Sequence, residues 1–396
     1  MRLLFSFAGG RGHVEPLVPI ARAAQAAGHT VALAGGHSTL RDVAALGFTA
    51  FPLGPAGTHA PVRRVPLQEL DAEREERDLR ERFVRRTARD RVPAVLALCA
   101  DWQPDLLVCD ETDFGGMVAA ERLGLPHATV LVIAAGSFVR PDVVAQALDE
   151  LRAEHGLPRD PDLAMLSRFL ILSPFPPTYR DPAFPLPATA HSFRPLMSET
   201  TRNAAPPWPV RLPGAPTVLF TLGTVFNLES GDLFTRVLAG LRALPIEVVT
   251  TVGSQIDPEE LGPLPDTIHV ERYIPQFLVL PHCSAVVSHG GSGSVIAALA
   301  HGLPQVVIPM GADQPLNAVR CRELGVARVL DAVRATPQEV REAVSAVLSD
   351  PAYRSAAERV RDEIAALPGP EHAVTLFERL VTERRPLLST RPPETG

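Results

Sequence analysis

The chain has 396 residues and no lysine, so all 38 of its basic residues are arginine. Schiff-base catalysis and the Walker phosphate loop both require a lysine and are therefore excluded. Only four cysteines occur, and they form no CxxC pair and no cysteine–histidine cluster at zinc spacing: Cys99, Cys109, Cys283 and Cys321. This pattern predicts reduced thiols and a cytoplasmic protein.

Long apolar runs are also missing. No segment reaches the roughly 18 apolar residues that a membrane span requires, and the initial "MRLLFSF" is too short for a signal-peptide core. A formal net charge of −7 is small for this length, which argues against a nucleic-acid-binding surface. We therefore expect a soluble protein with small-molecule partners.

Short apolar segments alternate with helix-like segments in both halves of the chain, for example "RLLFSF", "TVALAGG", "PDLLVCD", "TVLFTLGT" and "AVVSHGG". This rhythm predicts an α/β fold with two Rossmann-like, doubly wound parallel-sheet domains. Prolines gather between residues 173 and 216, which marks a boundary. We expect an N-terminal domain over 1–205, a linker over 206–216, a C-terminal domain over 217–372, and a helix with a flexible tail over 373–396.

The run "VPLQELDAEREERDLRERFVRRTARDRV" at 65–92 interrupts this rhythm with charges of both signs. It is typical of a solvated helix with charge pairs four residues apart. A mobile flap over a binding cleft is the alternative.

The unusual motifs follow apolar strands, where open parallel sheets bind their ligands. In "AGGRGHVEP", Gly10 and Gly12 begin like a dinucleotide fingerprint, but the third glycine position is Glu15. The strand over 30–36 ends without the acidic residue that holds a ribose. A nicotinamide site is therefore a poor match.

The same turn carries His13, which is a natural base for a hydroxyl at neutral pH, although a lone histidine is more often structural. Such a base needs a carboxylate to orient it. Asp110, directly after "LLVC", is the best-placed candidate, with Glu111 and Asp113 as rivals. An aspartate before a helix can instead be an N-cap.

A glycine-serine cluster, "HGGSGS" at 289–294, lies between a strand and a helix. Backbone N–H groups at a helix N-terminus bind phosphate, although such a cluster alone can be an ordinary tight turn. "TLGT" at 221–224 is a second candidate phosphate contact, and Asp313 with Gln314 offers the hydrogen bonds that sugar hydroxyls need. The segment predicts a site for a diphosphate flanked by a sugar.

Together, "GRGHVEP", "YIPQ", "HGGSGS" and "GADQPLNA" resemble the inverting natural-product glycosyltransferases of GT-B architecture, in particular bacterial enzymes that attach sugars to polyketides and macrolides. The resemblance covers essentially the whole chain. It implies two domains that face each other across a cleft, with the tail helix crossing back to the N-terminal domain.

The resemblance also implies roles for residues. His13, oriented by Asp110, would deprotonate the acceptor hydroxyl, which then displaces the nucleoside diphosphate with inversion. The donor-binding set would be Gly223, Thr224, Tyr273, Ile274, His289, Gly291, Ser292, Gly293, Ser294, Asp313 and Gln314. Within this set, Tyr273 and Ile274 would lie beside the nucleobase of the donor. No metal and no further cofactor is implied.

Two positions depart from the family pattern. UDP-sugar enzymes often carry a ribose-binding glutamate where this chain has Ala297, which favours a dTDP-sugar. Tyr273 stands where relatives often have tryptophan, and a phenol still packs against a pyrimidine. Phe83 and Phe138 are candidate acceptor contacts from their positions, although either can belong to the core.

The sequence thus predicts an O-glycosyltransferase that moves a sugar, a deoxysugar by preference, from dTDP to a lipophilic natural product. The alternatives are a glycolipid glycosyltransferase, a nucleotide-sugar epimerase of the same architecture, or a non-catalytic nucleotide-sugar-binding partner. C-glycosylation and a homodimer both remain open.

Overall fold

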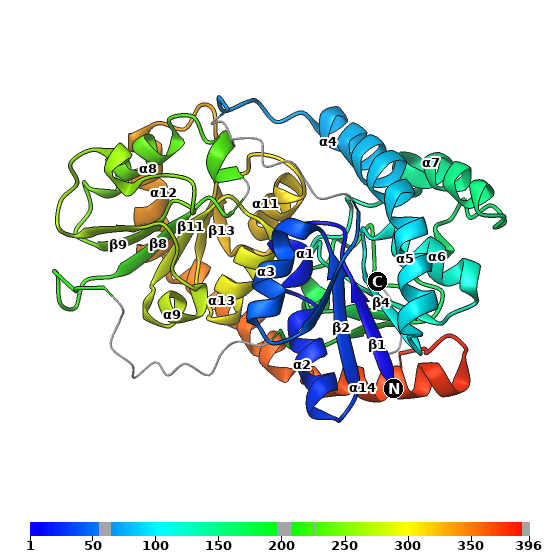
Figure 1. Cartoon of the computed structure of the whole chain (residues 1–396). Helices are drawn as coiled ribbons and strands as arrows, with labels where there is room; N and C mark the ends of the chain where they lie inside the picture. The colour runs from blue at the N-terminus through cyan, green and yellow to red at the C-terminus, as the bar shows by residue number, and fades with distance from the viewer. Residues whose placement is uncertain (55–64, 196–207, 225, 390–396) are drawn as a thin grey trace. The chain divides into compact units, whose positions relative to one another are not determined.

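A computed structural model describes residues 1–54, 65–195, 208–224 and 226–389 (Figure 1). The chain divides into two compact units. The first consists of Met1–Thr58, Glu73–Leu196 and Leu367–Gly396, and the second of His59–Ala72 and Met197–Ala366. Residues 55–64, 196–207, 225 and 390–396 lie outside the described ranges, including the expected domain boundary at 205 and the end of the expected tail.

The first unit contains a parallel sheet in the order β3-β2-β1-β4-β5-β6-β7. Its strands are β1 Arg2–Ser6, β2 Thr30–Gly35, β3 Thr49–Pro52, β4 Leu106–Asp110, β5 His127–Val130, β6 Ile171–Ser173 and β7 Ala190–Ser192. The buried runs of these strands are apolar on both faces, because helices cover both sides of a parallel sheet. The order places β1 beside β4, so the ends of these two strands meet at one edge.

The helices of this unit are α1 Arg11–Val14, α2 Val18–Ala26, α3 His37–Ala45, α4 Ala72–Asp78, α5 Arg89–Trp102, α6 Phe114–Leu123, α7 Pro141–Glu154 and α14 Glu371–Glu383, with the π-helix η1 Leu79–Ala88 and the 3₁₀ turns η2 Ala164–Leu166 and η3 Pro177–Tyr179. On one face, Leu3 and Phe5 pack against α2 and α14. The rings of Phe5 and Phe377 lie 6.1 Å apart. The tail helix α14 therefore packs against the sheet of the first unit and is part of that unit (Figure 1).

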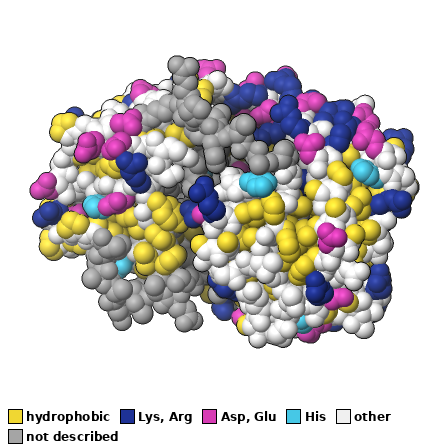
Figure 2. Space-filling model, in the orientation of Figure 1, with side chains coloured by type: hydrophobic (Ala, Val, Ile, Leu, Met, Phe, Trp, Pro, Cys, Tyr) yellow, Lys and Arg dark blue, Asp and Glu magenta, His cyan; other side chains and the backbone are white. Residues whose placement is uncertain are grey.

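On the opposite face, Leu4 and Cys109 pack against η1, α5, α6 and α7. Of the charged run at 65–92, residues 72–92 form α4, η1 and the start of α5. Its buried side chains include Leu79, Val84 and Ala88, while arginines pair with α7, as in Arg85–Glu150 and Arg89–Glu154. Figure 2 shows arginine and acidic side chains interspersed on the surface. This segment is thus a helix with one buried stripe and an ion-paired exposed side.

The second unit contains a parallel sheet in the order β10-β9-β8-β11-β12-β13. Its strands are β8 Thr217–Thr221, β9 Glu247–Thr251, β10 Ile268–Glu271, β11 Ala285–Ser288, β12 Gln305–Val307 and β13 Ala327–Val329. Its helices are α8 Leu233–Leu241, α9 Gln276–Val279, α10 Ser292–Ala300, α11 Gln314–Glu323, α12 Pro337–Ser349 and α13 Pro351–Ala366, with the turns η4 Phe226–Glu229, η5 Pro258–Leu261 and η6 Leu280–His282. The predicted α/β fold with two Rossmann-like parallel sheets is confirmed.

Residues just before α4 join the second unit rather than the first. The Val65 N–H donates to the Leu228 carbonyl at 2.9 Å, and Leu67 packs against that unit's core. Residues 65–72 therefore pack with the second unit, although the residues that follow them in the sequence belong to the first. Across the described ranges, no helix is both long enough and apolar enough to span a membrane.

Candidate active site

His13 lies on α1, the single helical turn that follows β1. Its imidazole packs directly against the backbone of Gly9, where a β-carbon would stand 2.3 Å from Nε2. Glycine is therefore required at position 9 for the ring to occupy this place. The tight turn expected from "AGGRGH" has this physical reason.

Asp110 lies at the end of β4 and is fully buried. Its Oδ1 is 3.4 Å from His13 Nδ1. Three donors hold the carboxylate: the N–H of Ala8 at 2.6 Å, the N–H of Thr112 at 2.7 Å and the Thr112 hydroxyl at 2.6 Å. Thr112 Oγ1 also lies 3.1 Å from His13 Nδ1. The structure brings the predicted pair together and adds Thr112, which sequence reasoning missed.

The electrostatics of this cluster favour an ionised carboxylate. Burial disfavours the charge of Asp110, but His13 and the hydrogen bonds from Thr112 and Ala8 outweigh it, so the pKa of Asp110 is lowered. A carboxylate here accepts a hydrogen bond from Nδ1–H, and in that tautomer the lone pair of the neutral imidazole lies on Nε2. The arrangement can therefore support a general base.

The two rival acids are bound elsewhere. Asp113 caps α6 by accepting from the Gly116 N–H at 3.0 Å and forms a buried bidentate ion pair with Arg91 at 2.8 and 2.7 Å. The N-cap alternative thus applies to Asp113. Glu111 accepts from the N–H groups of Val132 and Ile133 and lines a separate cavity.

Phe83 and Phe138 are both half-buried against the core face that carries η1 and α7. The Phe83 ring is stacked on His13, with centroids 5.9 Å apart and planes inclined by 24°. Phe83 thus contacts the candidate base directly, which a purely structural core position does not require. Phe138 has no such contact.

In the second unit, His289 follows β11 and is nearly buried. Its imidazole fits between two glycines: a β-carbon on Gly223 or on Gly291 would lie 2.6 Å from the ring. Gly223 also has a φ of +75°, which favours glycine. Burial lowers the pKa of His289 to about 4, so the ring is neutral at pH 7. It can offer a hydrogen bond to a phosphate but no positive charge.

Ser292, at the start of α10, donates to Asp313 Oδ2 at 2.6 Å. The Asn317 amide donates to the same oxygen at 2.8 Å, to Ser292 Oγ at 3.1 Å and to the Gly290 carbonyl at 2.9 Å. Burial raises the pKa of Asp313. Asn317, absent from the predicted set, therefore ties the glycine-serine loop to the acidic residue after β12.

Gln314 is buried, and its Oε1 accepts from the N–H groups of Met310 and Gly311 at 2.8 and 3.3 Å. This side-chain oxygen shapes the loop, and the sugar contact expected for Gln314 stays a prediction.

Of the remaining predicted donor residues, Gly293 and Ser294 lie in the first turn of α10. Ser294 Oγ accepts from the Gln276 amide at 3.2 Å, and Ile274 and Ala297 pack against one apolar cluster. Tyr273 is half-exposed. Thr224 is exposed, and a β-carbon at Gly293 would meet no atom within 4 Å.

In the part of the chain that the structure describes, no group of three histidine, cysteine or acidic side chains could hold a metal ion.

Comparison with known proteins identifies the family of this chain. Residues 22–167 match the N-terminal domain, and residues 235–380 the C-terminal domain, of the family described as erythromycin biosynthesis protein CIII-like. The chain belongs to this family. Its expected identity as a glycosyltransferase with a nucleotide-sugar donor is thereby confirmed.

Known relatives resemble the chain over nearly its full length. The 3-alpha-mycarosylerythronolide B desosaminyl transferase of Saccharopolyspora erythraea is 30% identical, over 97% of this chain and 99% of its own.

Solved structures agree. The glycosyltransferase SnogD from Streptomyces nogalater superposes with a TM-score of 0.77, at 29% identity, over 96% of this chain and 99% of its own. The spinosyn rhamnosyltransferase SpnG, solved with thymidine diphosphate, gives a TM-score of 0.79 at 26% identity, over 96% of this chain and all (100%) of its own.

Proposed function

We propose that this CIII-like protein transfers a deoxysugar from a dTDP-sugar to a hydroxyl of a lipophilic natural product, with inversion at the anomeric carbon. The observation that carries the proposal is the contact of His13 with a buried, ionised Asp110 at the edge shared by β1 and β4. A non-catalytic binding partner would not need such a pair.

In the proposed reaction, His13 Nε2 accepts the proton of the acceptor hydroxyl while Nδ1–H is held by Asp110 and Thr112. The acceptor oxygen forms the new bond to the anomeric carbon, and the bond from that carbon to the diphosphate oxygen breaks. The electron pair leaves with the dTDP. Asp110 stabilises the imidazolium that forms.

The leaving diphosphate would be held by N–H groups at the start of α10 and by the neutral His289, with Ser292 positioned by its hydrogen bond to Asp313. The α10 helix has nine residues, so its dipole adds to this interaction. Neighbouring residues Asp313, Asn317 and Gln314 form a rigid hydrogen-bonded wall suited to sugar hydroxyls.

Support for dTDP comes from two sources. SpnG has been solved with thymidine diphosphate, and Ala297 in this chain contacts an apolar cluster instead of offering a carboxylate to a 2′-hydroxyl. For the acceptor, SpnG has also been solved with spinosyn aglycone, and the desosaminyl transferase acts on a macrolide. We infer a polyketide-type acceptor for this chain.

The first experiment is thermal unfolding with dTDP, UDP and NAD at equal millimolar concentrations. A ligand at a hundred times its Kd adds roughly 2.7 kcal/mol of stability. Stabilisation by dTDP above UDP supports the proposed donor, whereas stabilisation by NAD alone contradicts the whole site.

The reaction itself is tested by mass spectrometry of products from dTDP-sugars and a panel of polyketide aglycones. His13→Ala should abolish the glycoside while dTDP still stabilises the fold. Transfer at the wild-type rate by His13→Ala would refute the base. Ala297→Glu is the matched donor-site variant, and it should shift preference toward UDP.

A further inference from the structure

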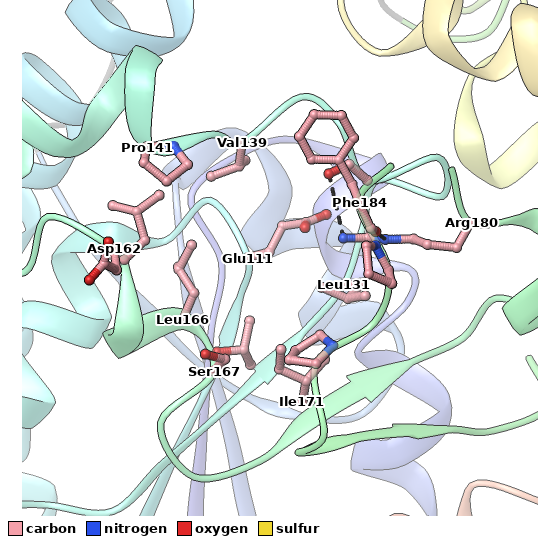
Figure 3. Close-up of a pocket in the computed structure, with 15 residues that line it drawn as sticks. Glu111, Leu131, Val139, Pro141, Asp162, Leu166, Ser167, Ile171, Arg180 and Phe184 are labelled. Atoms are coloured by element: carbon pink, nitrogen blue, oxygen red, sulfur yellow. Dashed lines mark hydrogen bonds between the residues drawn. The ribbon is translucent and has the colours of Figure 1, made fainter. Parts of the chain in front are cut away.

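A cavity of about 260 Å³ lies in the first unit, over β5 and β6. Its walls are mainly apolar and include Leu131, Val139, Leu166, Ile171 and Phe184. At this size it lies just below the roughly 300 Å³ at which pockets for drug-sized ligands begin, so it suits a small ligand or one part of a larger one. Glu111 and Arg180 lie together at one end, and Asp162 lies at the other side (Figure 3).

Glu111 is nearly fully buried, and both of its hydrogen bonds end on Oε1. Val132 donates to that oxygen at 2.8 Å and Ile133 at 2.5 Å. The second oxygen, Oε2, accepts no hydrogen bond from any residue of the described ranges. Glu111 therefore has a fixed carboxyl with one acceptor position left for a ligand.

Arg180 faces this carboxyl, and one of its nitrogen donors makes no hydrogen bond to a described residue. Its Nε donates to the Phe184 carbonyl at 2.9 Å and its Nη2 to the Gly136 carbonyl at 3.4 Å. Its Nη1 is buried and has no partner among the described residues. A β-carbon on Gly136 would stand 1.8 Å from the guanidinium carbon, so glycine admits the group.

Glu111 and Arg180 influence each other's pKa by charge, but within the described ranges they form no direct ion pair. Burial raises the pKa of Glu111 to about 7. A buried acceptor and a buried donor that face each other without touching lack the contact that would compensate their loss of water. A bridging molecule would supply one donor and one acceptor.

We propose that this cavity is a recognition subsite for a neutral, lipophilic hydroxyketone, whose hydroxyl donates to Glu111 Oε2 and whose ketone accepts from Arg180 Nη1. In its ionised form, Glu111 offsets the charge of Arg180, so a neutral ligand then fits better than an anion. Apolar walls hold the carbon skeleton.

If the proposed function holds, the hydroxyketone is the part of the acceptor remote from the hydroxyl that is glycosylated. Glu111 follows Asp110 directly in the chain. The cavity lies on the sheet face that carries Phe83, the residue stacked on His13. Val139, which lines the cavity, packs against that same face. Glu111 and Arg180 thus become specificity-determining residues.

The probe is benzoin, a hydroxyketone between two phenyl rings, measured by calorimetry against two analogues. Deoxybenzoin lacks the hydroxyl and diphenylethanol lacks the ketone. Benzoin should bind the wild-type chain about tenfold more tightly than either analogue, as expected for one buried hydrogen bond to a charged group.

Glu111→Gln keeps an acceptor for Val132 and Ile133 but replaces Oε2 by a donor, so benzoin should bind no better than deoxybenzoin. Arg180→Met should lower the affinity for benzoin to that for diphenylethanol. Asp162→Asn, on the far side of the cavity, is the control and should leave all three affinities unchanged. Melting temperatures establish that each variant is folded.

The analogue series on the wild-type chain keeps the test valid if a variant fails to fold. Equal affinity for benzoin and its analogues, or no binding of benzoin, would overturn the subsite. Tighter binding of diphenylacetate would overturn the neutral hydroxyketone in favour of an anion.

The two proposals fail separately. Benzoin binding in the expected pattern without any response to dTDP or sugar transfer refutes the proposed function and leaves the subsite. Sugar transfer by a chain that does not distinguish benzoin from deoxybenzoin refutes the subsite alone.

Discussion

Gly9 lies against the imidazole of His13 so closely that a β-carbon on Gly9 would be 2.0 Å from the ring's Cδ2. Real β-carbons do not approach another atom this closely, so any side chain at position 9 must displace the ring. The position of the candidate base thus depends on a residue that makes no hydrogen bond to it.

Gly9→Ala should therefore lower kcat by about a hundredfold or more, the usual contribution of a general base. Gly10→Ala is the matched control, because a β-carbon there would meet no atom within 4 Å and its φ is −83°. Both variants are assayed with any acceptor that the wild-type chain glycosylates, and dTDP binding should be unchanged in both. Equal losses in the two variants would show that the turn itself, rather than the ring position, is sensitive.

Thr112 should act as a positioning residue for the His13–Asp110 pair. Thr112→Val removes the hydroxyl that donates to Asp110 at 2.6 Å and lies 3.1 Å from His13 Nδ1. We expect kcat to fall about tenfold with the donor KM unchanged, since one hydrogen bond is lost while Asp110 remains. Asp110→Asn should cost more, about a hundredfold or more.

Thr112→Ser supplies the control, because its hydroxyl can restore both contacts. Rates that stay low in Thr112→Ser would point to packing of the methyl group instead.

Asn317→Asp should disrupt the donor wall of the second unit. The fully buried Asn317 amide donates to Asp313, Ser292 and the Gly290 carbonyl. An aspartate has no such donor and sets a second carboxylate beside Asp313. We expect a loss of unfolding free energy of about 3 kcal/mol and weaker dTDP binding, measured by denaturation and calorimetry.

Asn317→Ala removes the amide without adding charge and should cost less. If the two variants are equally stable, repulsion from Asp313 is not the cause.

Stability should fall as pH rises through 7 because of Glu111. Burial raises its folded-state pKa from 4.5 to about 7, so the fold binds the proton more tightly than the unfolded chain does. The resulting stability is fully present below pH ~4.5 and lost as pH rises through ~7, about 3 kcal/mol in all. Denaturant unfolding of the wild-type chain should show this loss.

Glu111→Gln cannot titrate and should lack that component. His289 acts in the opposite direction, since its lowered pKa of about 4 removes stability as pH falls below ~6.5. A Glu111→Gln variant with an unchanged pH dependence would contradict the assignment to Glu111.

The sequence by itself determined the fold class, because apolar strands and helical segments alternate in a way that only covered parallel sheets satisfy. It also paired His13 with Asp110, whose side chains lie 3.4 Å apart in the structure. Both follow strands, and neighbouring strands β1 and β4 bring their carboxyl ends to the same edge. The glycines near His289 were interpreted as room for a phosphate, and only the structure showed that Gly223 and Gly291 also make room for the His289 ring.

Only the tertiary structure decided which acidic side chain contacts His13. Asp110, Glu111 and Asp113 are nearly adjacent in sequence, but Asp110 ends β4, Glu111 lies in the turn that follows, and Asp113 is the N-cap of α6. Residues distant in sequence then determine what each acid contacts. Arg91 of α5 forms an ion pair with Asp113, and Arg180, far along the chain, faces Glu111. Thr112 and Asn317 were missed likewise, because hydrogen bonds between segments distant in sequence leave no periodic or spacing signal.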